Sequence, residues 1–138
     1  MTIKISTLAR NIAGAAIVSL VDQGSTRSSG LLEIRSGTRP ASPQAPAFGT
    51  ILASVSLAIP AFREFANGIA RANAIAGPVI ILNTGTATWF RVYDRNNQAV
   101  FDGDVSKDGT PGDLVFDYVN FVAGGVVNIN NLFATMPE

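Results

Sequence analysis

The hydrophobic pattern of the chain changes at Gly30, and this change constrains the fold more than any other feature. From Gly30 onward, short alternating apolar runs are separated by clusters of Gly, Pro, Asn and Asp. Such spacing is typical of short strands joined by turns. About eight strands can be counted, which is the number in a jelly roll. We therefore expect a mainly β fold, an antiparallel jelly-roll-like β-sandwich, with an immunoglobulin-like or other sandwich as the alternative because strand order stays open.

The segment before Gly30 has helical spacing instead. Apolar residues recur at intervals of three and four between Ser6 and Val21, with Ser6 or Thr7 available as N-cap and Gly24 just past the end. This predicts one N-terminal amphipathic helix over about residues 6–22. A spanning helix needs about 20 apolar residues, so we expect no membrane role. The length of 138 residues is that of one domain, expected over residues 1–138.

Several strands can be placed from the alternation alone. The run from Ile51 to Leu57 is the clearest half-buried strand, and a strand is also expected around Leu32 and Ile34. The turn at residues 94–97 predicts a hairpin from Trp89 to Val105. One further run, 69–76, places alanine at every second position, which implies close packing of that face against something.

Prolines at a spacing of three mark the chain between two of these strands. Pro40, Pro43 and Pro46 lie in residues 37–48, which we expect to form an extended, polyproline-like arm or loop. An extended segment adds contact area without a larger core. This arm and the N-terminal segment are therefore predicted to reach across subunits of an assembly.

The chain contains neither cysteine nor histidine, which excludes most catalytic constellations and thiolate or imidazole metal sites. Carboxylate pairs such as Asp102 with Asp117 remain formally possible, but nothing in their spacing selects them. The cluster of Asp102, Asp104 and Asp108 suggests calcium, yet its spacing does not match an EF-hand loop. We therefore expect no enzyme activity, no cofactor and no metal.

The net charge is zero but unevenly distributed. Residues 1–91 carry eight cations and three anions, a net +5, whereas residues 92–138 carry two cations and seven anions, a net −5. This indicates either acidic turns in the second half or docking surfaces of opposite sign. Eight of the ten cations are arginine, the cation enriched at protein interfaces. Without a basic run, we expect no nucleic-acid partner.

The strand around Trp89 carries the most informative surface. Trp89, Arg91 and Tyr93 lie on the face opposite Phe90 and Val92, and together they resemble an interface hot spot or a sugar-stacking platform. Burial of both faces between a sheet and the helix is an equally good interpretation. The expected interface residues are Arg39, Pro40, Pro43, Pro46, Phe48, Phe62, Trp89, Arg91 and Tyr93.

Several short motifs are spread throughout the chain. They are Leu8-Ala9-Arg10-Asn11, Asp22-Gln23-Gly24-Ser25, Gly30-Leu31-Leu32-Glu33-Ile34, Gly37 with Pro40-Ala41, Gly49-Thr50-Ile51-Leu52-Ala53, Pro60-Ala61-Phe62, Trp89-Phe90-Arg91-Val92-Tyr93-Asp94 and Val100-Phe101-Asp102-Gly103. Together they resemble a family of small virion structural proteins of tailed bacteriophages and prophages.

The resemblance covers nearly the whole chain but carries no catalytic motif. It implies a capsid decoration or cement protein, made in the host bacterial cytoplasm and located in the virion. Its implied partners are the major capsid protein and further copies of itself, as a dimer or trimer. A head–tail or tail component is the alternative in the same setting, and a carbohydrate-binding β-sandwich module using Trp89 and Tyr93 is the alternative of another class.

Overall fold

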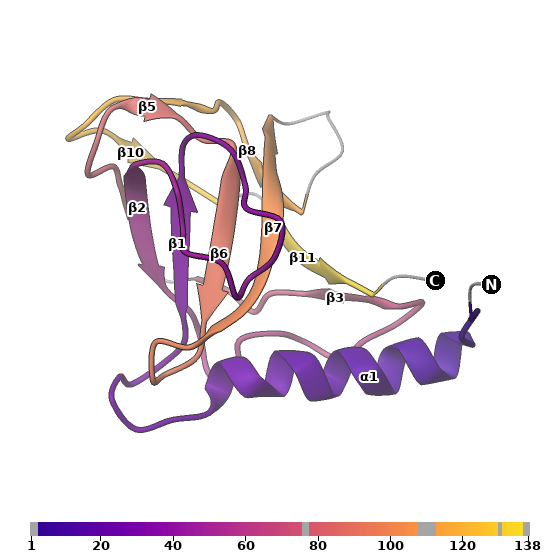
Figure 1. Ribbon diagram of the computed structural model, residues 1–138. Coiled ribbons are helices and arrows are strands. Elements are labelled where there is room, and N and C mark those ends of the chain that lie inside the picture. The colour runs from indigo at the N-terminus through magenta and orange to yellow at the C-terminus, as the bar shows by residue number, and fades with distance from the viewer. Residues whose placement is uncertain (1–2, 76–77, 108–112, 130, 137–138) are drawn as a thin grey trace.

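The computed structural model describes residues 3–75, 78–107, 113–129 and 131–136 (Figure 1). The chain is mainly β, with one N-terminal helix, as predicted. Helix α1 covers Thr7–Ser19 and is followed by a 3-10 turn, η1, at Leu20–Asp22. The strands are β1 (Leu31–Arg35), β2 (Ile51–Ser56), β3 (Ile69–Arg71), β4 (Val79–Ile80), β5 (Gly85–Thr86), β6 (Trp89–Tyr93), β7 (Ala99–Lys107), β8 (Leu114–Phe116), β9 (Asn120–Phe121), β10 (Val126–Val127) and β11 (Asn131–Thr135).

Seven of the strands form one sheet in the order β2-β1-β6-β7-β8-β11-β3, and two small sheets pair β10 with β4 and β5 with β9. The large sheet is mixed, because β8 pairs parallel to β7 with Val105 opposite Leu114. A purely antiparallel sheet was expected, but side-chain alternation fixes which face a residue occupies and not the direction of the neighbouring strand. The pairings do not establish the two-sheet arrangement of a jelly roll.

The predicted hairpin between Trp89 and Val105 is confirmed as the antiparallel pair β6 and β7. The Asp94 carboxylate closes its turn by accepting hydrogen bonds from the backbone N–H groups of Asn96 (2.8 Å) and Gln98 (2.9 Å). Asn97 occupies the left-handed region with φ 65°, a conformation that asparagine tolerates better than most residues.

Helix α1 begins where the sequence predicts. The Ser6 hydroxyl accepts a hydrogen bond from the Ala9 N–H at 3.1 Å, which satisfies one of the free donors of the first turn. On the inner side, the Arg10 guanidinium donates to the Met136 carbonyl (2.7 and 3.2 Å) and the Asn11 side chain accepts from the Gly68 N–H (2.8 Å). These bonds fasten α1 beside β3 and β11 (Figure 1).

The core lies against one face of the central strands. Leu32, Ile34, Phe90 and Val92 point to this face and are fully buried. Phe62 joins them, with its ring centroid 6.0 Å from that of Phe101. Phe62 was predicted as an interface residue, but the described structure buries it in the core, where its backbone forms an antiparallel bridge with Ala72.

Candidate docking surfaces

The proline-rich segment is a loop that lies on its own sheet, and not an arm that projects from it. We call residues 36–50 the proline loop. Its ends meet through two hydrogen bonds between Ser36 and Thr50, each 3.1 Å long. At Gly49, φ is +83° and a Cβ atom would lie 1.8 Å from the Ser36 carbonyl oxygen, so only glycine fits the close approach. In Figure 1 the loop crosses the front of β1, β6 and β7.

Buried charges on the sheet hold the proline loop in place. The Arg91 guanidinium makes two hydrogen bonds to the Asp102 carboxylate, at 2.7 and 3.0 Å, and both side chains are nearly fully buried. Its remaining donors reach the loop carbonyls of Ala45 (2.8 Å) and Ser42 (3.4 Å). The hydrogen bond to Asp102 raises the pKa of Arg91, and burial opposes this rise. Arg91 therefore links the loop to the sheet.

A second polar cluster lies beside the first, on the same face. Glu33 pairs with Arg35 at 2.6 Å and accepts a hydrogen bond from the Tyr93 hydroxyl at 3.2 Å. Arg35 also donates to the Gly49 carbonyl at the end of the loop, at 3.2 Å. Burial and the neighbouring Glu33 carboxylate raise the pKa of Tyr93, because both disfavour the phenolate.

Trp89 completes the contact between loop and sheet. Its side chain is 1 % exposed, and its indole N–H donates to the Ser36 carbonyl at 3.1 Å. Both faces of β6 are therefore buried, which agrees with one of the two interpretations of the sequence. The cover is the proline loop and not the helix. Trp89 and Arg91, predicted as interface residues, stabilise the loop from below and offer no surface to a partner in this structure.

The other predicted interface residues are spread over the proline loop and its rim. Pro40 is buried, whereas Pro43 and Tyr93 are half-buried. Arg39, Pro46 and Phe48 are exposed, and Arg39 forms a surface ion pair with Asp104 at 3.4 Å. These three side chains are accessible to a partner without movement of the loop.

The outer side of α1 is an exposed apolar surface. Sequence reasoning named the N-terminal segment as a docking candidate but did not identify which of its side chains are exposed. The apolar spacing predicts one amphipathic stripe, but in the structure apolar residues occupy both sides of the helix. Val18 and Val21 face the core, while Leu8 is 69 % and Ile12 63 % exposed. We define the α1 outer face by its exposed residues Ile5, Leu8, Ala9, Ile12, Ala15, Ala16, Ser19 and Leu20.

The α1 outer face carries no charge. Arg10 is the only charged residue within Thr7–Ser19, and its guanidinium turns inward to the Met136 carbonyl. The solvent side of a surface helix normally carries charged and polar residues, and a helix that is apolar all round is normally buried. The absence of charge was readable from the sequence, but only the fold shows which side is exposed.

A second exposed apolar surface lies on the pair β4 and β10. Ile80 and Val126 face each other across this pair, and both are exposed. Leu82, Val122 and the ring of Tyr118 extend the surface, with the Tyr118 hydroxyl donating to the Val126 carbonyl at 2.8 Å. We call this set the β4–β10 surface. It lies well away from α1 (Figure 1).

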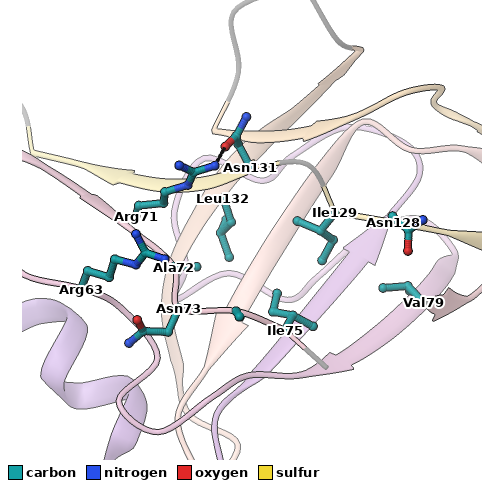
Figure 2. Close-up of a pocket in the computed structure, with 11 residues that line it drawn as sticks. Arg63, Arg71, Ala72, Asn73, Ile75, Val79, Asn128, Ile129, Asn131 and Leu132 are labelled. Carbon is teal, nitrogen blue, oxygen red and sulfur yellow. Dashed lines mark hydrogen bonds between the residues drawn. The ribbon is translucent and has the colours of Figure 1, made fainter. Parts of the chain in front are cut away.

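A pocket of about 340 Å³ opens between the chain at β3 and the chain at β11 (Figure 2). We call it the arginine pocket, because Arg63 and Arg71 lie at its mouth. The two residues are neighbours, since the Arg63 N–H donates to the Arg71 carbonyl at 2.8 Å. The Arg71 guanidinium donates to the Asn131 side chain and lies 6.0 Å from the centre of the Phe133 ring. Apolar side chains of Ile75, Val79, Ile129 and Leu132 line the interior.

The alternating alanines of residues 69–76 have two environments. Ala70 is buried against the core, as close packing predicts. Ala72 and Ala74 instead line the arginine pocket, where their small side chains leave space. Ala76 lies outside the described residues.

Metal binding finds no support among the residues that the structure describes, where no group of three or more acidic side chains converges. Asp102 is paired with Arg91, and Asp108, the third member of the cluster considered for calcium, lies outside the described residues. Within the same residues, no helix is long and apolar enough to cross a bilayer.

Comparisons with family models, curated proteins and solved structures find no match to this chain.

Proposed function

We propose that the protein is a structural component of tailed-bacteriophage virions, a capsid decoration or cement protein that binds the major capsid protein and stabilises the shell. It is made in the host bacterial cytoplasm and acts as a homo-oligomer, a dimer or trimer. The sequence resemblance supplies the setting. The proposal includes the finer fold expectation, a jelly-roll-like sandwich, which stays a prediction.

The observation that carries a docking function is the uncharged α1 outer face. Leu8 and Ile12 project from consecutive turns of the helix, and the small exposed residues Ala9, Ala15 and Ala16 belong to the same face. Burying a side chain such as Leu or Ile stabilises a complex by roughly 1.5–3 kcal/mol. Helix α1 is fixed to the sheet by Arg10 and Asn11, so the face is held rigidly and loses little freedom on binding.

A cement protein contacts more than one neighbour, and the β4–β10 surface supplies a second contact region. Its apolar side chains, including Ile80 and Val122, lie on a different element from α1. A stable interface buries about 1,200–2,000 Å² in total, so a partner must cover more than one helix face. Two separate apolar surfaces support a role between neighbouring subunits.

The alternative as a carbohydrate-binding module has less support. A sugar-stacking platform needs an accessible aromatic face, but Trp89 lies beneath the proline loop. A head–tail or tail component uses the same kind of docking surfaces and differs only in its partner. Capsid binding therefore separates the proposal from both alternatives.

The test is co-sedimentation of the purified protein with undecorated capsids, assembled from the major capsid protein encoded in the same genome. We expect saturable binding and an increased thermal stability of the capsids. The substitution Ile12→Glu should weaken binding about tenfold or more, because it places a charge in the buried contact. Failure of the wild-type protein to bind the capsids at any concentration would contradict the proposal.

Ser28→Glu is the matched control, because it adds the same charge at an exposed site outside α1. Both variants should unfold in urea within about 0.5 kcal/mol of the wild type, since the changed side chains are exposed. Equal capsid binding by the Ile12→Glu variant and the wild type would contradict docking through α1.

A further inference from the structure

The arginine pocket holds two positive charges that the described chain does not neutralise. Arg35, Arg39 and Arg91 each have a carboxylate partner in the described residues. No such ion pair involves Arg63 or Arg71 there, and the described residues that line the pocket include no acidic residue.

The two uncompensated positive charges lie next to each other at one end of the pocket. Arg63 and Arg71 face each other across hydrogen-bonded backbone segments, where like charges repel. Asn131 accepts a hydrogen bond from Arg71 and fixes its orientation, but a neutral amide compensates no charge. An anion from outside the chain would therefore be attracted to this mouth.

The residues that line the interior of the pocket indicate which chemical group of a ligand lies next to its negative group. In Figure 2 the two arginines and Asn131 lie at one end, and Ile75, Ile129 and Leu132 lie beyond them. A ligand that fills the pocket needs a negative group at the mouth and an apolar group next to it.

We infer that the arginine pocket binds an extended acidic peptide segment of a partner protein, with a carboxylate on Arg63 and Arg71 and an adjacent apolar side chain in the interior. Planar guanidinium groups bind carboxylates through two parallel hydrogen bonds. This inference rests on the proposed function, in which the capsid shell supplies the segment.

A peptide fits the pocket better than a nucleic acid. Binding of single-stranded nucleic acid uses aromatic stacking platforms along a basic groove. Among the described residues that line this pocket none is aromatic, and Ile75, Val79, Ile129 and Leu132 give it an apolar part. Sequence-independent contact with phosphates also uses many cations, whereas two line the pocket.

The first experiment uses a short fluorescent peptide of alternating leucine and glutamate with blocked ends, and a matched peptide of leucine and glutamine. We expect fluorescence polarisation to show binding of the glutamate peptide, weakened by salt, and at least about tenfold weaker binding of the glutamine peptide. The double variant Arg63→Gln/Arg71→Gln should lose the preference for glutamate. Lys107→Gln, which removes an exposed cation outside the pocket, should keep it.

Equal affinity for both peptides, no binding of either, or an unchanged preference in the double variant would overturn the inference. A labelled single-stranded oligonucleotide tests the other class of anion. If the oligonucleotide binds through Arg63 and Arg71 and the peptide does not, the pocket is a phosphate site and the inference is wrong.

Capsid co-sedimentation separates this inference from the proposed function. Binding by the wild type and equal binding by the Arg63→Gln/Arg71→Gln variant would overturn the pocket's role and leave the decoration function standing. Peptide binding without capsid binding would support the pocket and contradict the capsid as its partner.

Discussion

Arg91 beneath the proline loop and Arg63 at the arginine pocket carry the same charge in opposite surroundings. Arg91 is 4 % exposed, and its donors reach Asp102 and two loop carbonyls. Arg63 is exposed and has no carboxylate partner among the described residues. The Arg91 charge is buried and paired with Asp102, because an unpaired buried charge is strongly destabilising. Arg63 and Arg71, which we call the open pair, are exposed and have no carboxylate partner among the described residues. Their guanidinium groups are therefore available to a partner.

The largest effect should come from breaking the buried pair. Asp102→Ala leaves the Arg91 guanidinium buried without its carboxylate, which costs about 3–5 kcal/mol of unfolding free energy. Urea unfolding measures this loss. Replacing both Arg91 and Asp102 by leucine should cost less, since no isolated charge remains, although the loop loses its anchor. A loss below about 1 kcal/mol for Asp102→Ala would show that Arg91 is less buried than the structure indicates.

A smaller effect should appear at alkaline pH through Tyr93. Burial and Glu33 raise the pKa of Tyr93 in the folded state. Above about pH 10 the unfolded chain loses this proton first, so stability falls as pH rises. For one group the slope is at most about 1.4 kcal/mol per pH unit.

Tyr93→Phe should reduce the loss of urea stability between about pH 8 and pH 11. The comparison uses slopes, because the variant also loses a hydrogen bond to Glu33 at neutral pH. Tyr118→Phe keeps Tyr93 and serves as control. An identical dependence of urea stability on pH in the Tyr93→Phe variant and the wild type would contradict a raised pKa of Tyr93 in the folded protein.

The smallest effect on stability should come from the open pair. Arg63→Gln/Arg71→Gln removes exposed charges without breaking an ion pair, so unfolding free energy should change by less than about 0.5 kcal/mol. Scanning calorimetry or urea unfolding checks this. A loss above about 2 kcal/mol would remove the contrast, because it would make Arg63 and Arg71 structural residues like Arg91.

The local features of this protein are determined by local sequence. Ser6 marks the start of α1 because its hydroxyl can cap the first turn, and the Asp94 carboxylate with Asn97 sets the β6–β7 turn. Alternating apolar residues correctly separate Phe90 and Val92 from Trp89 and Arg91 on the two faces of β6. Each of these depends on residues within a few positions of one another.

The tertiary structure decided what covers each face. Nothing near Trp89 in the sequence shows that Ser36 lies above it, or that Ala45 accepts from Arg91. Alternation likewise leaves the parallel direction of β8 beside β7 undetermined. The outward side of α1 was also settled only by packing, because apolar residues surround the helix and either side could have faced the sheet. Long-range contacts choose among arrangements that local patterns allow equally, and at Arg63 and Arg71 that choice brings two like charges together at an open pocket.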